Sequence, residues 1–252
     1  DIISTVSETY ADEIQTEEYG YGFDGIIRAG KDRLRGIING IDYEANNPET
    51  DKRIDVNYSA DNAEAKKENK RLLQERLGLE QRGVPMICMI SRLADQKGLD
   101  ILANAMERLM QNDIQFVILG TGEKRYEDMF RYYENRWKGR FCSCIMFDDT
   151  LAQKIYASGD MFLMPSRFEP CGLGQMFSLR YGTVPVVRKT GGLSDSVEQF
   201  NGENGTGNGF LFETYDAEGI LWAVGEALKI YADTDKWNTL VKNCMNTKLS
   251  WN

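Results

Sequence analysis

Between residues 86 and 187 the sequence alternates short apolar runs with longer segments that place apolar residues at helical spacing. The run Met-Ile-Cys-Met-Ile at 86–90 and the run Met-Phe-Leu-Met at 161–164 contain no charged residue, a pattern typical of strands buried on both faces of a sheet. Strands and helices that alternate through short loops form a parallel sheet covered on both sides. We therefore predict an α/β fold with a doubly wound, mostly parallel, Rossmann-like sheet.

The individual elements follow from the same periodicity. The expected strands span residues 86–90, 114–119, 141–147, 161–164 and 184–187. The expected helices span residues 60–77, 99–110, 123–137, 151–158, 173–181, 216–231 and 233–248. The helix at 60–77 is rich in charged residues and is followed by Gly78, a residue type that commonly ends helices. We expect the charged residues of this helix to form a solvated face.

Composition narrows the classes of partner and of chemistry. The chain has 252 residues and a net charge of −9, which argues against nucleic acid or an anionic membrane as a partner. It contains no histidine, which excludes Ser-His-Asp and Cys-His catalysis and His-ligated zinc from this polypeptide. Its five cysteines form no CxxC pair, as expected for reduced thiols in a cytosol. We expect all of them except Cys171 to be buried small residues.

The amino-terminal part differs from the regular region. A possible helix cap at 4–7 precedes a helical pattern at 8–15, and a loop rich in tyrosine and glycine follows at 18–24. That loop is either a sugar-stacking loop or an ordinary turn. A short strand pattern at 33–38 leads into a polar, irregular stretch, so we place a domain boundary between residues 1–42 and 43–252. The sequence begins in the middle of a pattern and ends abruptly, so we expect this chain to be a piece of a longer protein.

The loop after the apolar run at 161–164 has the sequence PSRFEPCGLGQ, residues 165–175. It carries one carboxylate, Glu169, and its two prolines restrict the backbone. At Gly172-Leu173-Gly174 it opens a helix whose free backbone N–H groups can bind an anion. In an open α/β sheet, ligands bind beyond the carboxyl ends of the strands. The loop is therefore either a ligand-binding loop or only a well-made strand-to-helix turn.

A second loop, SRLADQKG at 91–98, follows the predicted strand at 86–90. It places Arg92 and Lys97 five residues apart. Both cations could pair with a diphosphate without a metal ion. The alternative is a pair of solvated surface cations, but the position directly after a buried strand favours a functional role.

Further strand ends carry weaker signals. Phe147 ends the predicted strand at 141–147, where an exposed ring could stack on a nucleobase, although core packing is the more frequent role of phenylalanine. The sequence RKTGGL at 188–193 is a possible second anion-binding nest, or a simple turn. The GTG at 120–122 lacks the third glycine of a dinucleotide fingerprint, because Arg125 stands in its place. Loops from one sheet edge thus suit a ligand with a ring, two phosphates and a polyhydroxyl group, which describes a nucleotide sugar.

From about residue 5 to residue 197 the chain resembles bacterial glycogen synthase and plant starch synthase, retaining glucosyltransferases with the GT-B fold. The matching stretches are TVS at 5–7, EIQTEEYG at 13–20, GIINGID at 36–42, NPETD at 47–51, SRL at 91–93, QKGLD at 96–100, PSRFEPCGL at 165–173 and KTGGL at 189–193. The resemblance implies two Rossmann-like domains with the active site between them. Residues 1–42 would be the tail of the first, acceptor-side domain, and residues 43–252 most of the second, nucleotide-sugar-binding domain.

The resemblance also implies roles for single residues. The donor-binding residues that it implies are Asn39, Arg92, Lys97, Phe147, Cys171, Gly172, Leu173, Gly174, Thr190, Gly191 and Gly192. By the family pattern Arg92 and Lys97 hold the donor diphosphate, and Glu169 contacts the transferred glucose or lies closest to the chemistry. These three are the expected catalytic residues. No metal ligand and no cofactor are expected beyond the substrate.

Three positions depart from the family pattern. Gly174 replaces a threonine, which leaves only a backbone contact to phosphate, and Phe147 replaces a tyrosine that stacks on adenine. Asn46 replaces an aromatic residue. The larger absence is the amino-terminal domain with its lysine-glycine-glycine loop and active-site histidine, so we expect the chain to be inactive alone.

The expected function is extension of α-1,4-glucan from ADP-glucose with retention of configuration. The alternative is a non-catalytic module that binds a nucleotide sugar or a glucan. The expected partners are ADP-glucose, the glucan and the missing amino-terminal domain, with no nucleic acid and no membrane. The expected location is the bacterial cytoplasm, or the plastid for a plant protein.

Overall fold

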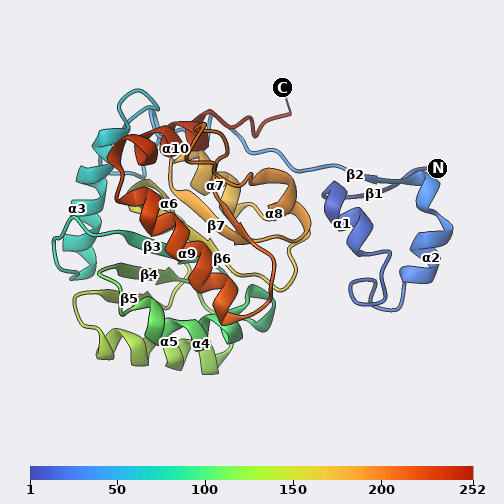
Figure 1. The fold of residues 1–252 in the computed structure, drawn as a ribbon, viewed down its shortest axis with the longest axis horizontal. Coiled ribbons are helices and arrows are strands. Elements are labelled where there is room, and N and C mark those ends of the chain that lie inside the picture. The colour runs from blue at the N-terminus through green and yellow to red at the C-terminus, as the bar shows by residue number, and fades with distance from the viewer. Residues whose placement is uncertain (252) are drawn as a thin grey trace.

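The computed structural model describes residues 1–251, which form a large α/β body and a smaller amino-terminal unit (Figure 1). The strands of the large body are β3 Met86–Ile90, β4 Gln115–Leu119, β5 Phe141–Cys144, β6 Met161–Met164, β7 Val184–Arg188 and β8 Phe210–Phe212. Its α-helices are α3 Lys66–Leu77, α4 Leu99–Leu109, α5 Lys124–Arg136, α6 Asp149–Ser158, α7 Gly174–Arg180, α8 Gly191–Ser196, α9 Ala217–Tyr231 and α10 Thr234–Asn246.

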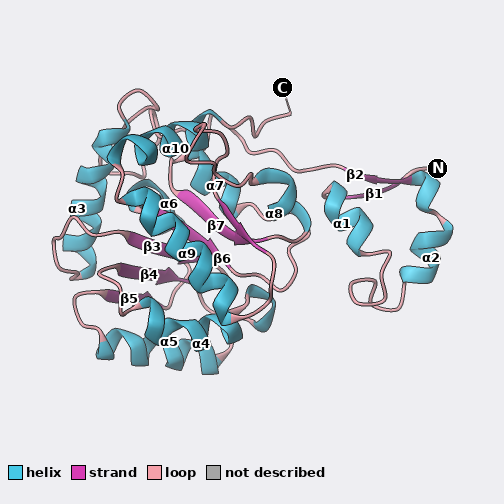
Figure 2. Ribbon diagram, in the orientation of Figure 1, coloured by secondary structure: helices cyan, strands magenta, loops and turns pink. Residues whose placement is uncertain are grey.

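The six strands form one parallel sheet in the order β5-β4-β3-β6-β7-β8. The chain builds outward from β3 to β5, then returns to the other side of β3 and builds outward to β8, with helices on both faces (Figure 2). Residues Met86, Ile87 and Cys88 of the central strand are completely buried, as an uninterrupted apolar run predicts. The predicted doubly wound, Rossmann-like fold is confirmed. The strand order reverses between β3 and β6, and such a switch point is where open α/β sheets bind ligands.

The amino-terminal unit contains β1 Ile3–Thr5, α1 Glu8–Glu13, α2 Asp24–Ala29 and β2 Leu34–Gly36. β1 and β2 pair in parallel as a separate sheet, beside the large body in Figure 1. The possible cap at 4–7 is confirmed at Ser7, whose hydroxyl accepts the backbone N–H of Tyr10. Helix α2 was not predicted, because the glycine and tyrosine residues before it indicated only a loop. α1 packs against α8 and so joins the two parts.

Two predictions about the large body need correction. The strand predicted at 141–147 ends at Cys144, so Phe147 lies in the following loop. The charged residues of α3 do not all face solvent, since Lys66 and Lys70 are both more than nine-tenths buried. α3 ends at Gly78 with φ 66°, as the sequence predicts.

Among residues 1–251, no helix combines the length and the apolar character needed to cross a membrane.

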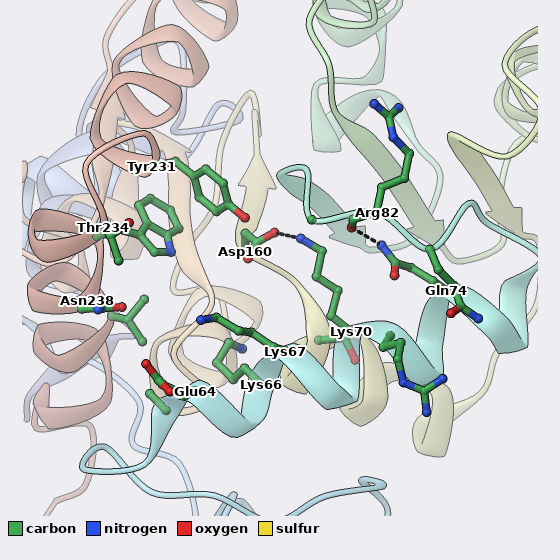
Figure 3. A pocket seen from close by; sticks show the side chains of 17 residues that line it. Glu64, Lys66, Lys67, Lys70, Gln74, Arg82, Asp160, Tyr231, Thr234 and Asn238 are labelled. Atoms are coloured by element: carbon green, nitrogen blue, oxygen red, sulfur yellow. Dashed lines mark hydrogen bonds and ion pairs between the residues drawn. The ribbon is translucent and has the colours of Figure 1, made fainter.

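Tertiary contacts of Lys66 and Lys70 explain their burial. The Lys66 ammonium group lies 3.3, 3.1 and 2.9 Å from the carbonyl oxygens of Tyr156, Ala157 and Tyr181. It thereby donates to the carboxyl-terminal turns of two neighbouring helices, where carbonyl groups lack helical partners. Lys70 Nζ pairs with Asp160 at 2.6 Å, and both residues line a cavity of about 580 Å³ (Figure 3). Helical periodicity alone could not show these partners, which lie more than 80 residues away along the chain.

Candidate active site

The loops that follow β3 and β6 meet at the switch point because a glycine, Gly98, allows close packing. Gly98 has φ 71°, and a Cβ atom at this position would lie 1.9 Å from the carbonyl oxygen of Pro165. The backbone N–H of Arg167 donates to the carbonyl oxygen of Gln96 at 2.9 Å. Only glycine combines this positive φ with so close a backbone approach. The packing brings the second predicted cation beside the predicted carboxylate.

Lys97 and Glu169 form an ion pair at the junction of these loops. Lys97 Nζ lies 2.5 Å from Glu169 Oε2, and the hydroxyl of Ser166 donates to the same oxygen at 3.1 Å. Glu169 is only 6% exposed, so the lysine compensates a carboxylate that is largely removed from water. The two predicted catalytic residues therefore lie together, although 72 positions separate them in the sequence.

A cavity of about 150 Å³ opens beside this pair. Its lining residues are Met89, Ile90, Ser91, Arg92, Lys97, Leu163, Met164, Ser166, Glu169, Gly172, Leu173 and Gly174. Within residues 1–251 the side chain of Arg92 has a single hydrogen bond, to Gln96 Oε1 at 3.0 Å, and no carboxylate partner. The backbone N–H groups of Gly172 and Leu173 have no acceptor in the same part of the chain. These groups form a cationic, N–H-rich wall that suits a diphosphate.

A second cavity of about 400 Å³ adjoins the first and shares Ile90, Ser91 and Arg92 with it. The side chain of Phe147 is 92% exposed at its rim. This exposure excludes the alternative of core packing for Phe147 and leaves the ring free to stack on a planar ligand. A ring and a diphosphate could thus bind in adjoining spaces that meet at Arg92.

Sequence reasoning missed two polar residues of the second cavity. Ser91 Oγ and Gln153 Oε1 are buried there without a hydrogen-bond partner among residues 1–251, and Gln153 is only 4% exposed. Buried polar atoms are normally hydrogen-bonded, so both are candidates to contact a ligand. The position of Ser91 directly after a buried strand could have indicated a ligand contact. Gln153 lies inside α6, and nothing in the sequence around it indicated such a contact.

The remaining predicted residues lie around the Glu169 loop. Burial raises the pKa of the Cys171 thiol, and the nearby backbone N–H of Asn39 partly offsets this rise. Cys171 is 4% exposed, so it resembles the other buried cysteines, contrary to our expectation. A Cβ atom at Gly174 would lie 3.0 Å from the ring of Phe162. The bulky Phe162 therefore explains why glycine is suited to this position.

The predicted anion-binding nest at the start of α8 does hold an anionic group, a carboxylate of the chain itself. Glu13 Oε1 accepts the hydroxyl of Thr190 at 2.8 Å and the backbone N–H of Gly191 at 2.9 Å. Gly192 N donates to the carbonyl oxygen of Glu169 at 3.1 Å. Whether Thr190, Gly191 and Gly192 also bind the donor stays a prediction.

In the described part of the chain, residues 1–251, no three His, Cys, Asp or Glu side chains gather closely enough to hold a metal ion. The cations of the first cavity could instead neutralise phosphate charge directly.

Comparison with known proteins identifies the family. The sequence model described as glycosyl transferases group 1 matches residues 74–243, which include the entire six-stranded sheet and its switch point. The chain belongs to the glycosyl transferases group 1 family. A second model, described as the starch synthase catalytic domain, matches residues 1–29. The first match therefore covers most of the large body, and the second match covers α1 and α2.

Individual relatives within the family carry related names. The glycogen synthase of Fervidobacterium nodosum is 56% identical over 251 residues, which are 100% of this chain and 52% of that protein. The glycogen synthase of Kosmotoga olearia is 57% identical over 249 residues, 99% of this chain and 52% of that protein. The chain spans about half the length of the curated relatives it matches. The resemblance to bacterial glycogen synthase is confirmed.

A solved structure extends the similarity to three dimensions. The catalytic domain of starch synthase IV from Arabidopsis thaliana, bound to ADP and acarbose, superposes with a TM-score of 0.93 at 37% identity. The match covers 99% of this chain and 52% of that one. The likeness to starch synthase is therefore one of fold as well as of sequence.

Proposed function

We propose that the protein to which this chain belongs transfers glucose from ADP-glucose to the 4-hydroxyl end of an α-1,4-glucan, with retention and without an obligatory metal. The observation that carries the proposal is the Lys97–Glu169 pair, which lies at the switch point beside Arg92. The glycogen synthases at 56–57% identity support it. The structure of starch synthase IV, which has ADP and acarbose bound, also supports the proposal.

The chemistry assigned to the first cavity is charge stabilisation. As the bond between the anomeric carbon and the diphosphate oxygen breaks, negative charge grows on the departing ADP. Arg92 and Lys97 would stabilise that charge, which is usually the largest contribution to such catalysis. The acceptor 4-hydroxyl oxygen forms the new bond on the same face of the sugar, and its proton passes to the departing ADP. Glu169 would hold the transferred glucose beside them.

The two parts of the chain support separate roles in acceptor binding and donor binding within the complete protein. We assign residues 1–42 to the acceptor-side domain and its hinge, and residues 43–252 to the donor-binding domain. The second cavity, with Phe147 at its rim and Ser91 and Gln153 inside, would receive the nucleoside. The glucan would enter from the side of the remaining half, and the chain alone would bind donor without efficient transfer. We place the protein in the bacterial cytoplasm.

The test is a transfer assay with the complete protein, ADP-glucose and a maltooligosaccharide. We expect release of ADP, stepwise lengthening of the glucan through α-1,4 bonds, and unchanged activity in EDTA. Calorimetry with ADP and with the oligosaccharide separates the alternatives. ADP binding without transfer would indicate a nucleotide-sugar-binding module, and glucan binding without ADP binding would indicate a glucan-binding protein.

A further inference from the structure

The carboxylate of Glu13 holds the start of α8 from a distance of 177 residues along the chain. Its Oε1 accepts both the Thr190 hydroxyl and the Gly191 N–H. Four residues earlier on α1, the backbone N–H of Thr9 donates to Asp195 Oδ2 at 3.0 Å. These contacts join α1 to both ends of α8, so the amino-terminal unit holds α8 in place.

The start of α8 in turn packs on the main chain that carries Glu169. A Cβ atom at Gly191 would lie 2.0 Å from the carbonyl oxygen of Glu169, and one at Gly192 would lie 2.2 Å from that of Cys171. The backbone N–H of Gly192 donates to the Glu169 carbonyl oxygen. With no space between these backbones, a shift of α8 moves Glu169 as well.

An aromatic contact reaches the same loop from the same unit. The rings of Tyr21 and Phe168 meet edge to face, with centroids 5.9 Å apart. Tyr21 has φ 49°, which is uncommon for a residue other than glycine. Phe168 directly precedes Glu169, so the loop at 18–24 contacts the Glu169 loop. The sequence indicated only a sugar-stacking loop or an ordinary turn here and did not predict this contact.

We propose that Glu13 is a positioning residue that acts through Thr190 and Gly191 to hold Glu169 in its reactive place. This inference rests on the proposed function. Glu13 belongs to the segment assigned to the acceptor-side domain, whereas Glu169 belongs to the donor side. The contact therefore makes the placement of Glu169 depend on how the two parts are docked. A misplacement of about 1 Å in a catalytic group can cost about 10²-fold in rate.

The test compares Glu13→Ala, Glu13→Gln and Thr190→Val in the complete protein. Glu17→Ala is the matched control, because Glu17 is exposed and its side chain has no partner among residues 1–251. We expect Glu13→Ala to lower kcat roughly 10- to 100-fold, with KM for ADP-glucose changed by less than about threefold. A glutamine can still accept both hydrogen bonds through one oxygen, so Glu13→Gln should restore kcat to within about threefold.

A double substitution separates positioning from general stability. If Glu13 acts through Glu169, Glu13→Ala should cause no further loss of kcat in a Glu169→Ala background. Thr190→Val should lower kcat less than Glu13→Ala and should not add to it. Independent, additive losses would overturn the inference, and so would a kcat for Glu13→Ala equal to that of Glu17→Ala.

Hydrogen exchange tests the same inference without any assay of activity. Glu13→Ala should speed amide exchange at residues 165–172 and 189–193, roughly 10-fold, because the hydrogen bonds that hold α8 are lost. Glu17→Ala should leave both segments unchanged. Unchanged exchange in Glu13→Ala would overturn the inference. If the wild type transfers no glucose but Glu13→Ala shows faster exchange, the proposed function fails while the mechanical link from Glu13 to the Glu169 loop stands.

Discussion

Lys97 Nζ lies 2.5 Å from Glu169 Oε2 at the point where the loops after β3 and β6 cross. An ammonium group has three donors, so Lys97 can keep this contact and also bind a phosphate oxygen. The carboxylate in turn keeps the hydroxyl of Ser166. Under the proposed function, Lys97 would contact the diphosphate of the nucleotide sugar while Glu169 contacts its sugar.

Lys97→Ala in the complete protein should lower turnover roughly 10²-fold or more, about 2.7 kcal/mol of barrier. The charge that grows on the departing ADP would lose one of two cations, and Glu169 would lose its counter-ion. Steady-state kinetics with ADP-glucose measure the effect. Lys138→Ala is a suitable control, because Lys138 is exposed and has no ion-pair partner among residues 1–251. Unchanged turnover would remove Lys97 from the mechanism.

Glu169→Ala should be at least as damaging as Lys97→Ala. It removes the contact to the sugar and leaves the Lys97 ammonium group without its carboxylate. Glu169→Gln keeps an acceptor for Ser166 and lacks the charge, so its turnover should lie between alanine and wild type. The measurement is kcat at saturating donor. Full activity of the alanine variant would mean that the 165–175 loop is only a turn.

Phe147→Ala should weaken ADP binding by roughly 1–3 kcal/mol, the range found for stacking of a base on an aromatic side chain. Because the ring is 92% exposed, its removal should leave the melting temperature unchanged. Calorimetric titration with ADP measures the affinity, and Phe147→Tyr, which keeps the stacking surface, is the control. An unchanged Kd for the alanine variant would place the nucleobase elsewhere.

Lys66 should make stability depend on pH. Burial lowers the pKa of Lys66 to about 7 from 10.5, so between these values the unfolded chain binds more protons than the folded chain. The free energy of unfolding should then rise with pH across this window, by at most about 1.4 kcal/mol per pH unit from this group. Urea unfolding at several pH values should show a smaller slope for Lys66→Met, which cannot titrate.

The exposed neighbour Lys67 supplies the control for that measurement. Lys67 makes no hydrogen bond or ion pair within residues 1–251, and Lys67→Met should keep the wild-type slope. Equal slopes for wild type and Lys66→Met would show that Lys66 does not titrate in this range.

Much of the donor site follows from the sequence because its signals are local. An apolar run such as 161–164 indicates a buried strand, and the loop after a parallel strand lies at the ligand-binding edge of the sheet. That rule places Arg92, Lys97 and Glu169 at one edge before any coordinates are known. The same reasoning failed for Lys66 and Lys70, because charge along a helix predicts solvent exposure only where no other element supplies partners.

The sequence by itself determined the alternation of strands and helices between residues 86 and 187, the loops that carry the site and the family resemblance, all properties of neighbouring residues. Only the tertiary structure decided which distant groups meet. It paired Lys97 with Glu169 and set Glu13 against Thr190. It also left Gln153 Oε1 at the second cavity without a hydrogen-bond partner among residues 1–251. The physical reason is that periodicity describes one element at a time. Side-chain partners depend on how closely separate elements pack, which glycines such as Gly98 permit.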